Sequence, residues 1–359
     1  MNKQTITILF FLVFISGFGQ IPAGYYDSAQ GLMRYQLKTA LKNIISNGHT
    51  PHSYGELYTA YETTDTDYYY ENDGTVLDMY SERPNQAETY NYHHNNNTCG
   101  NYQSEGDCYN REHLLPKSIF NSDSPMKSDA HFVVPTDGYV NNRRSSYPFG
   151  EVNNPTWTSM NGSKLGTNVT SGYSGTVFEP IDEFKGDIAR MMLYVAVRYE
   201  DRVASWDTST HMLNGTSDQV YENWFLQLLM NWHQQDPVSQ REIDRNNAVY
   251  NYQGNRNPFI DHPEYVAWIW DPNATLNAIE NTRVVVYPNP VRNKEIHLNY
   301  NGNDLIKQVK IFDETGKMVF TRQANDFHTF QLSNLLPGIY LIKIYLNNNA
   351  FVVKKLIIE

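Results

Sequence analysis

Residues 108–152 decide the fold of the chain and read CYNREHLLPKSIFNSDSPMKSDAHFVVPTDGYVNNRRSSYPFGEV. A first strand is expected to end shortly before Pro116, and the extended run from His131 to Val134 is expected to end at Pro135. Thr136-Asp137 then provides the N-cap of a short helix. The stretch therefore predicts a strand, a loop, a second strand and a helix.

Two adjacent residues at the end of the first predicted strand, Glu112 and His113, suit phosphodiester hydrolysis. This reaction needs a nucleophilic water, relief of charge at phosphorus and help for the leaving oxygen, which a general base and one hard cation can supply. His113 is the natural base because the ordinary pKa of histidine is about 6.5, and Glu112 offers hard oxygen to Mg²⁺. Neighbouring strand residues point to opposite faces, so the strand must end or bulge here for both to reach one phosphate.

A Glu-His pair alone is a weak signal, but a long ordered match surrounds it. The segment resembles the endonuclease I family of periplasmic and secreted nucleases, whose ββα-metal finger carries motifs of this kind. The matching motifs are NREH at 110–113, DAHFVVP at 129–135 and VNNRRS at 140–145, followed by SYPFGEV at 146–152, KGDIAR at 185–190 and QGNRNPFIDHPEY at 253–265. The resemblance spans roughly residues 21 to 270.

The resemblance implies a role for each matched position of the finger. His113 is expected to be the general base, and Glu112 with Asn141 the protein ligands of a single Mg²⁺ that keeps several waters. Asn142 is the nearest rival of Asn141, and Mn²⁺ or Ca²⁺ are alternative metals. The implied activity is sequence-non-specific cleavage of DNA, and often of RNA, to products with a 5′-phosphate.

The phosphate-binding arginine of some relatives has no clear match, because the loop between Pro116 and His131 is short. The candidates for substrate binding are Arg111, Arg143, Arg144, Arg245 and Arg256. Arg111 could equally pair with a carboxylate. We expect His131 to orient the finger through hydrogen bonds rather than to bind metal.

The N-terminus has the order of a secretory signal peptide. Met-Asn-Lys precedes an apolar run from Ile6 to Ile15 and small residues up to Gly19, where we expect cleavage. The run is shorter than the roughly 20 residues that span a bilayer. In an exported chain the only two cysteines, Cys99 and Cys108, are expected to form a disulfide rather than a metal pair or a nucleophile.

The sequence pattern changes after Trp270. The residues before Glu280 carry a formal charge of −14 and those from Glu280 onward carry +3, which together give the net charge of −11. Short β-rich runs separated by turn residues also replace the helical periodicity. The runs VYPNPVRN, DETGK and LLPGIYLIKI resemble the C-terminal sorting domains read by type IX secretion. A substrate-binding β-domain is the alternative interpretation.

The expected fold is α+β, with the ββα-metal finger embedded in a mixed helical domain and followed by a small all-β sandwich. Helical periodicity predicts helices at about 30–45, 184–199 and 217–233, and residues 74–80 could hold one strand. The expected divisions are a signal peptide at 1–19, a catalytic domain at 20–271, a linker at 272–283 and a sorting domain at 284–359.

Two other functions remain open at this point. A metal-independent hydrolase of acidic polysaccharide could use Glu112 with Asp129 or Asp137, and a catalytically inactive binding protein would need a broken motif. The net charge of −11 is unusual for a nucleic-acid-binding protein, although a hydrolase needs only a local field at its cleft. We expect DNA and RNA as substrates, the type IX machinery as a partner, no membrane span, and a monomer.

Overall fold

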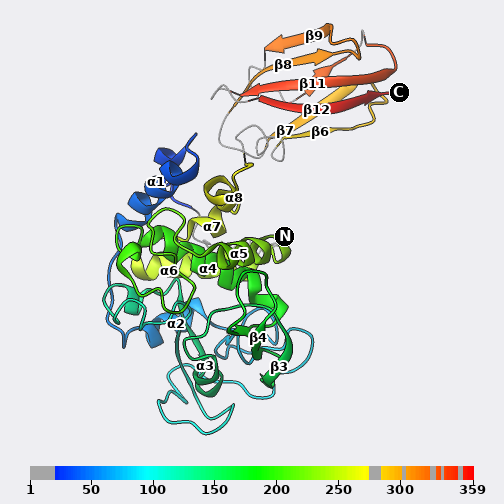
Figure 1. Ribbon diagram of the computed structural model, residues 1–359. Helices are drawn as coiled ribbons and strands as arrows, with labels where there is room; N and C mark the ends of the chain where they lie inside the picture. Colours follow the sequence, from blue (N-terminus) through cyan, green and yellow to red (C-terminus); the bar gives the residue numbers. More distant parts are fainter. Residues whose placement is uncertain (1–20, 275–283, 301–304, 324–328, 333–334, 347–350) are drawn as a thin grey trace, which may run out of the picture. The chain divides into compact units, whose positions relative to one another are not determined.

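The structure is a computed structural model that describes residues 21–274, 284–300, 305–323, 329–332, 335–346 and 351–359. The predicted signal peptide and most of the predicted linker lie outside the described residues. The chain divides into two compact units (Figure 1). The first contains the residues up to Tyr25 together with Ile45–Asp261, and the second contains Tyr26–Ile44 and His262–Glu359. The domain boundaries expected from the sequence stay predictions.

The first unit mixes helices with short antiparallel strands. Its elements are α2 (Leu57–Thr64), β1 (Tyr109–His113), η2 (Met126–Ser128), β2 (Val133–Asp137), α3 (Gly138–Arg144), β3 (Val152–Thr158), β4 (Lys164–Asn168), β5 (Thr176–Glu179), η3 (Asp182–Phe184), α4 (Lys185–Arg198), η4 (Val203–Ser205), α5 (Asn223–Gln235), α6 (Gln240–Gln253) and α7 (Pro258–Asp261). β1 and β2 form a two-stranded sheet, and β4 lies between β3 and β5 in a second sheet.

Helix α4 is the centre of this unit, and every one of its residues is buried (Figure 1). Three of its buried charged side chains, Lys185, Asp187 and Arg190, form ion pairs, which offsets the cost of burying a charge. Arg190 donates from Nε and Nη2 to the two carboxylate oxygens of Glu242 on α6 at 2.6 and 2.8 Å. Asp187 pairs in the same way with Arg241 of α6. These pairs fix α6 against the central helix.

The sequence 108–152 forms the predicted strand, loop, strand and helix. β1 and β2 are antiparallel, with Arg111 opposite Pro135, and the N-cap Asp137 accepts a hydrogen bond from Val140 N at 2.8 Å. β2 begins at Val133 and continues through Pro135, although we expected the strand to end there. In a two-stranded sheet each strand has one unpaired edge, so a proline without an N–H is accommodated.

The second unit is described by itself. It contains η1 (Asp27–Ala29), α1 (Arg34–Ser46, whose last two residues belong to the first unit), α8 (Tyr265–Trp270), β6 (Val284–Tyr287), β7 (Glu295–Tyr300), β8 (Ile306–Phe312), β9 (Met318–Gln323), β10 (Thr329–Gln331), β11 (Gly338–Leu346) and β12 (Phe351–Ile358). Its strands form two antiparallel sheets, in the orders β10-β7-β6 and β12-β11-β8-β9. Buried apolar residues of both sheets share one core, Ile296, Val309 and Ile344 among them.

Most of the predicted helices are present, but residues 74–80 do not form the strand that we considered. Only one isolated bridge, Thr66 with Val76, occurs there. The side chain of Asp78 accepts a hydrogen bond from Tyr80 N at 2.8 Å, which turns the backbone away from an extended path. The fold is thus mixed α+β, followed by an all-antiparallel β region.

Candidate active site

A pocket of about 730 Å³ opens where β1 ends and α3 begins. Its walls come from residues before and within α2, from the segment 98–102, from the end of β1 with the loop after it, and from α3. Glu112, His113 and Asn141 all line this pocket, although Asn141 is 28 positions after His113 in the chain. The antiparallel pairing of β1 with β2 returns the chain and places α3 beside the end of β1.

Glu112 is held in a fixed position at the base of the pocket. Its Oε1 accepts hydrogen bonds from the hydroxyl of Tyr80 at 3.0 Å and from Nη1 of Arg144 at 3.2 Å. Oε2 takes no side-chain donor among the described residues, and the backbone N–H of His113 also interacts with the carboxylate. Burial raises the pKa of the Glu112 carboxyl, while the charge of Arg144 and the Tyr80 hydroxyl oppose this rise. Oε2 is therefore the oxygen available to a cation.

His113 is the last residue of β1, so the strand ends where the sequence analysis required it to end. Its Nε2 lies 3.0 Å from the carbonyl oxygen of Lys127. A carbonyl only accepts hydrogen bonds, so Nε2 carries the proton and Nδ1 keeps its lone pair. Burial, supported by the nearby charges of Lys117 and Arg111, lowers the pKa of His113 to about 4. The ring is therefore neutral near pH 7, and no described residue bonds to Nδ1.

Asn141 presents its amide oxygen in a defined direction. Its Nδ2 donates to Oδ1 of Asn110 at 2.7 Å, which leaves Oδ1 of Asn141 as the free amide atom. Asn110 stands two residues before Glu112 on β1, so the two share one face of the strand. The neighbouring Asn142 also lines the pocket but is exposed, and no described residue holds it by a hydrogen bond.

Arg111 lines the pocket with a guanidinium group that two tyrosine rings support. Its Cζ lies 3.6 Å from the ring centre of Tyr54 and 4.5 Å from that of Tyr58, and Nη1 donates to the Tyr54 carbonyl at 2.7 Å. Nε is buried and has no hydrogen-bond partner among the described residues. Arg111 pairs with no described carboxylate, which was the alternative expected for it.

Arg144 is a buried structural link rather than a free cation. Besides Glu112 it bonds the carbonyl oxygens of His113 at 3.0 Å and Leu114 at 2.5 Å, and its side chain is only 1% exposed. It thus joins the last turn of α3 to the end of β1. Because its Nη1 and Nη2 atoms already bond to the protein and its Nε is buried, we do not assign it to the substrate.

The remaining candidate residues lie outside the pocket lining. Arg143 is exposed and donates to the hydroxyl of Tyr139 at 2.5 Å. Arg245 is buried and pairs with Asp65 at 2.8 Å, while Arg256 is buried and pairs with Asp261 at 2.6 Å. These two side chains hold α6 and α7 in the core.

His131 also lies outside this pocket. It is buried, and its Nε2 contacts the carbonyl of Asn255 at 3.0 Å. Asp129 accepts hydrogen bonds from the hydroxyls of Tyr194 at 2.9 Å and Tyr199 at 2.7 Å, and Asp137 caps α3. Neither carboxylate lines the pocket beside Glu112, so the acid pair of a polysaccharide hydrolase is not assembled there.

Cys99 and Cys108 form the predicted disulfide, with their Cα atoms 5.7 Å apart. The bond fixes the segment that contributes Cys99, Gly100 and Tyr102 to one wall of the pocket. The prediction from export and cysteine count is therefore confirmed.

Sequence reasoning missed two residues that position the metal-binding candidates. Tyr80 reaches Glu112 across 32 positions, and no local pattern marks it. Asn110 could have been found, because the period of two along β1 places it on the same face as Glu112.

The sequence comparisons define the protein class that this site belongs to. The chain belongs to the Endonuclease I family, which matches residues 33–264. It is therefore a nuclease, a hydrolase of phosphodiester bonds. A second family, the secretion system C-terminal sorting domain, matches residues 285–359.

Individual relatives are secreted nucleases. An extracellular ribonuclease of Bacillus subtilis (strain 168) is 36% identical over 249 residues, which are 68% of this chain and 78% of the relative. The extracellular ribonuclease of Bacillus amyloliquefaciens gives the same identity and coverage. An extracellular deoxyribonuclease of Aeromonas hydrophila is 27% identical over 136 residues, or 38% of this chain and 50% of that protein.

The sorting domain and the extracellular relatives show that the protein is secreted or displayed at the cell surface. The expected family and localisation are thus confirmed. Within the part of the chain that the structure describes, no helix combines the length and the apolarity needed to cross a membrane.

Proposed function

We propose that the chain is a metal-dependent, sequence-non-specific endonuclease that cleaves DNA and RNA and leaves a 5′-phosphate. The observation that carries this proposal is the neutral imidazole of His113 beside two hard oxygen donors in one polar pocket. Oε2 of Glu112 and Oδ1 of Asn141 are oxygens of the kind that Mg²⁺ binds, and neither accepts a hydrogen bond from a described side chain. The donor set therefore fits one magnesium ion that retains several waters.

Each residue of the pocket has its own role in the proposed reaction. Nδ1 of His113 accepts the proton of the attacking water, while the Lys127 carbonyl keeps the ring in the required tautomer. Tyr80 and Arg144 hold Glu112, and Asn110 holds Asn141, so the two ligands are in place before substrate arrives. A bound Mg²⁺ would supply charge stabilisation at phosphorus and at the leaving oxygen.

Arg111 is the proposed phosphate-binding residue of this chain. Its guanidinium group lines the pocket without a carboxylate partner among the described residues, and the rings of Tyr54 and Tyr58 keep its planar donor group in one orientation. Contacts to phosphate carry no sequence information, which agrees with non-specific cleavage. The Bacillus relatives are named as ribonucleases and the Aeromonas relative as a deoxyribonuclease, so we include both nucleic acids.

Cleavage assays on the mature protein test this function. Supercoiled plasmid, linear duplex and single-stranded RNA are incubated with Mg²⁺ or with EDTA, and the product ends are probed with a phosphatase followed by a kinase. We expect cleavage of all three substrates, full loss in EDTA, and kinase labelling only after phosphatase treatment. Cleavage that persists in EDTA, or labelling without phosphatase, would contradict the proposal.

A pair of arginine variants tests the assignment of Arg111. Arg111→Ala should raise KM for nucleic acid about tenfold or more, because one charge-assisted contact contributes about 1.5–3 kcal/mol. Arg143→Ala is the matched control, since it removes an equally basic, exposed side chain of the finger that does not line the pocket. Equal effects of the two substitutions would show that only overall charge matters.

A further inference from the structure

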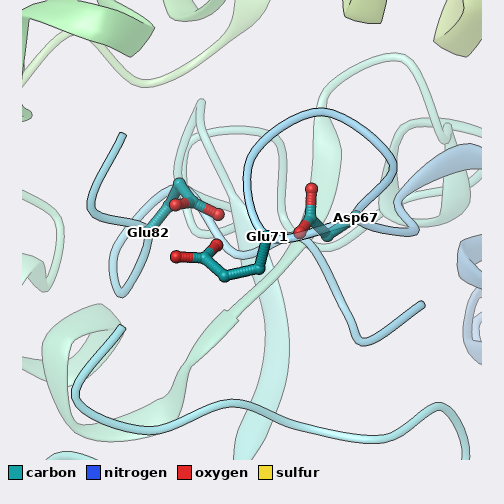
Figure 2. Close-up of side chains that lie close together, drawn as sticks. All are labelled: Asp67, Glu71 and Glu82. Carbon is teal, nitrogen blue, oxygen red and sulfur yellow. The ribbon is translucent and has the colours of Figure 1, made fainter. Parts of the chain in front are cut away.

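A second group of acidic side chains lies apart from the lining of the active-site pocket. The carboxylates of Asp67, Glu71 and Glu82 approach one another, with one oxygen of each within 4.8 Å of the others (Figure 2). Oxygens bound to Ca²⁺ at about 2.3–2.6 Å lie at most about 4.6–5.2 Å apart across the ion. The three oxygens therefore already occupy a space of the size of one calcium coordination sphere.

Backbone contacts preorganise the loop that contributes two of these side chains. Asp67 accepts hydrogen bonds from the backbone N–H groups of Tyr69, Tyr70 and Asn72 at 2.9, 3.0 and 2.9 Å. These bonds leave further lone pairs on its two oxygens. The loop is also bonded to α6 and η3, because the hydroxyls of Tyr69 and Tyr70 donate to Asp244 and Glu183 at 2.7 and 2.9 Å. The position of the loop is thus set without any cation.

Glu82 supplies an independent indication of a ligand. Its side chain is fully buried at 0% exposure, and Oε1 accepts a hydrogen bond from Arg83 N at 2.8 Å. Oε2 is buried and has no hydrogen-bond partner among the described residues, and Figure 2 shows the Glu82 carboxylate facing that of Glu71. A buried carboxylate oxygen without a partner is costly unless a cation or a proton compensates it.

No basic side chain of the described residues pairs with these three carboxylates, and further acids surround them. The carboxylates of Glu71, Asp67 and Asp78 lie close enough to Glu82 for their charges to repel its own. Such mutual repulsion identifies a place where a divalent cation would stabilise the folded chain.

We propose that Asp67, Glu71 and Glu82 bind a structural Ca²⁺ ion, separate from the catalytic metal. Ca²⁺ accepts irregular sets of six to eight oxygens, whereas Mg²⁺ requires a near-octahedral arrangement at shorter distance, and three carboxylates from two loops suit the larger ion. A secreted protein meets calcium at concentrations that fill weak extracellular sites, whose dissociation constants are about 10⁻⁴–10⁻³ M.

The ion would join the loop of Asp67 and Glu71 to the turn that contains Glu82. That turn is closed by the hydrogen bond from Glu82 N to Asp78 O at 2.9 Å, and it carries Tyr80, whose hydroxyl bonds the catalytic candidate Glu112. The proposed calcium site thus stabilises the support of the active site without contributing a group to it. The inference does not depend on the proposed nuclease mechanism.

Calorimetric titration with CaCl₂ tests the site in the full mature protein after removal of metals with a chelator. Because Ca²⁺ can also enter the pocket of Glu112 and Asn141, the titration is repeated in Asn141→Ala. We expect Asn141→Ala to keep one calcium equivalent, and Glu71→Gln to lose one equivalent or to bind it at least tenfold more weakly. Asp73→Asn removes the same charge from the same loop, outside the three-residue group, and should stay within threefold of wild type.

Thermal unfolding gives a second readout of the same site. Raising Ca²⁺ from 0.1 to 10 mM should increase the Tm of the wild type, Asn141→Ala and Asp73→Asn by several degrees, and should leave that of Glu71→Gln nearly unchanged. The proposal is overturned if Asn141→Ala binds no Ca²⁺, or if Glu71→Gln keeps the wild-type stoichiometry and affinity. Loss of nuclease activity in Asn141→Ala tests the catalytic centre alone.

Discussion

Replacing His113 by alanine should separate the general base from the metal ligands. The imidazole is 5% exposed, and its one described hydrogen bond goes to the Lys127 carbonyl, not to Glu112 or Asn141. The substitution therefore leaves both ligands with their supporting contacts. The Lys127 carbonyl loses its partner, which should lower the free energy of unfolding by about 1–3 kcal/mol.

The expected loss of rate is much larger than the loss of stability. Removing a general base typically lowers turnover by ~10²–10⁴-fold, which corresponds to about 3–5 kcal/mol in activation free energy. Since His113 does not bind the cation, this loss should be the same at every Mg²⁺ concentration. Asn141→Ala removes a ligand, so its activity should recover in part as Mg²⁺ rises.

Mg²⁺ titrations of plasmid cleavage measure this contrast for wild type, His113→Ala, Asn141→Ala and Glu112→Gln. The two ligand variants should shift the midpoint to higher Mg²⁺, and His113→Ala should lower the plateau at an unchanged midpoint. Circular dichroism checks folding, above all for Glu112→Gln, which takes the charged partner from buried Arg144. A wild-type plateau in His113→Ala would refute its role as the base.

Three further outcomes follow from the described contacts. Replacing Cys99 and Cys108 by serine should lower the free energy of unfolding by about 2–3 kcal/mol in non-reducing denaturant titrations, because the closed loop is short; an unchanged midpoint would contradict this. The pKa of buried His131 is lowered to about 4, so its contribution to stability is complete above pH 6.5 and is lost as pH falls from 6.5 to 4. Tm measured against pH should therefore fall less steeply in this window for His131→Gln than for wild type, and parallel curves would exclude His131 as a cause. A chain of residues 20–275 should retain plasmid cleavage, since every residue proposed for catalysis precedes the tail, and a chain of residues 1–275, which keeps the signal peptide, should lose export; a folded but inactive 20–275 chain would make the tail a substrate module.

The finger was predictable because its signals are local. Asp137 caps α3, β1 ends at His113, and both features can be read within a few residues of sequence. The roles of the arginines were not predictable in the same way. Arg144, Arg245 and Arg256 look alike as basic residues near polar motifs, but each finds a carboxylate partner that only the packed fold reveals.

Long-range contacts explain the other gaps between sequence and structure. Tyr80 lies in a stretch that was considered as a strand, yet Asp78 turns the backbone there and directs the tyrosine to Glu112. The acidic group of Asp67, Glu71 and Glu82 could likewise not be predicted from the sequence, because Asp67 and Glu82 are 15 positions apart in a segment without periodicity.

The disulfide between Cys99 and Cys108 also links the final structure of the pocket to export of the chain. Thiols stay reduced in the cytosol and become oxidised in the compartments that an exported chain enters. The wall formed by Cys99, Gly100 and Tyr102 therefore receives its covalent cross-link only after the chain has left the compartment that holds the genome and the messenger RNA of its own cell. Completion of this part of the active site is thereby timed by passage across a membrane rather than by folding alone.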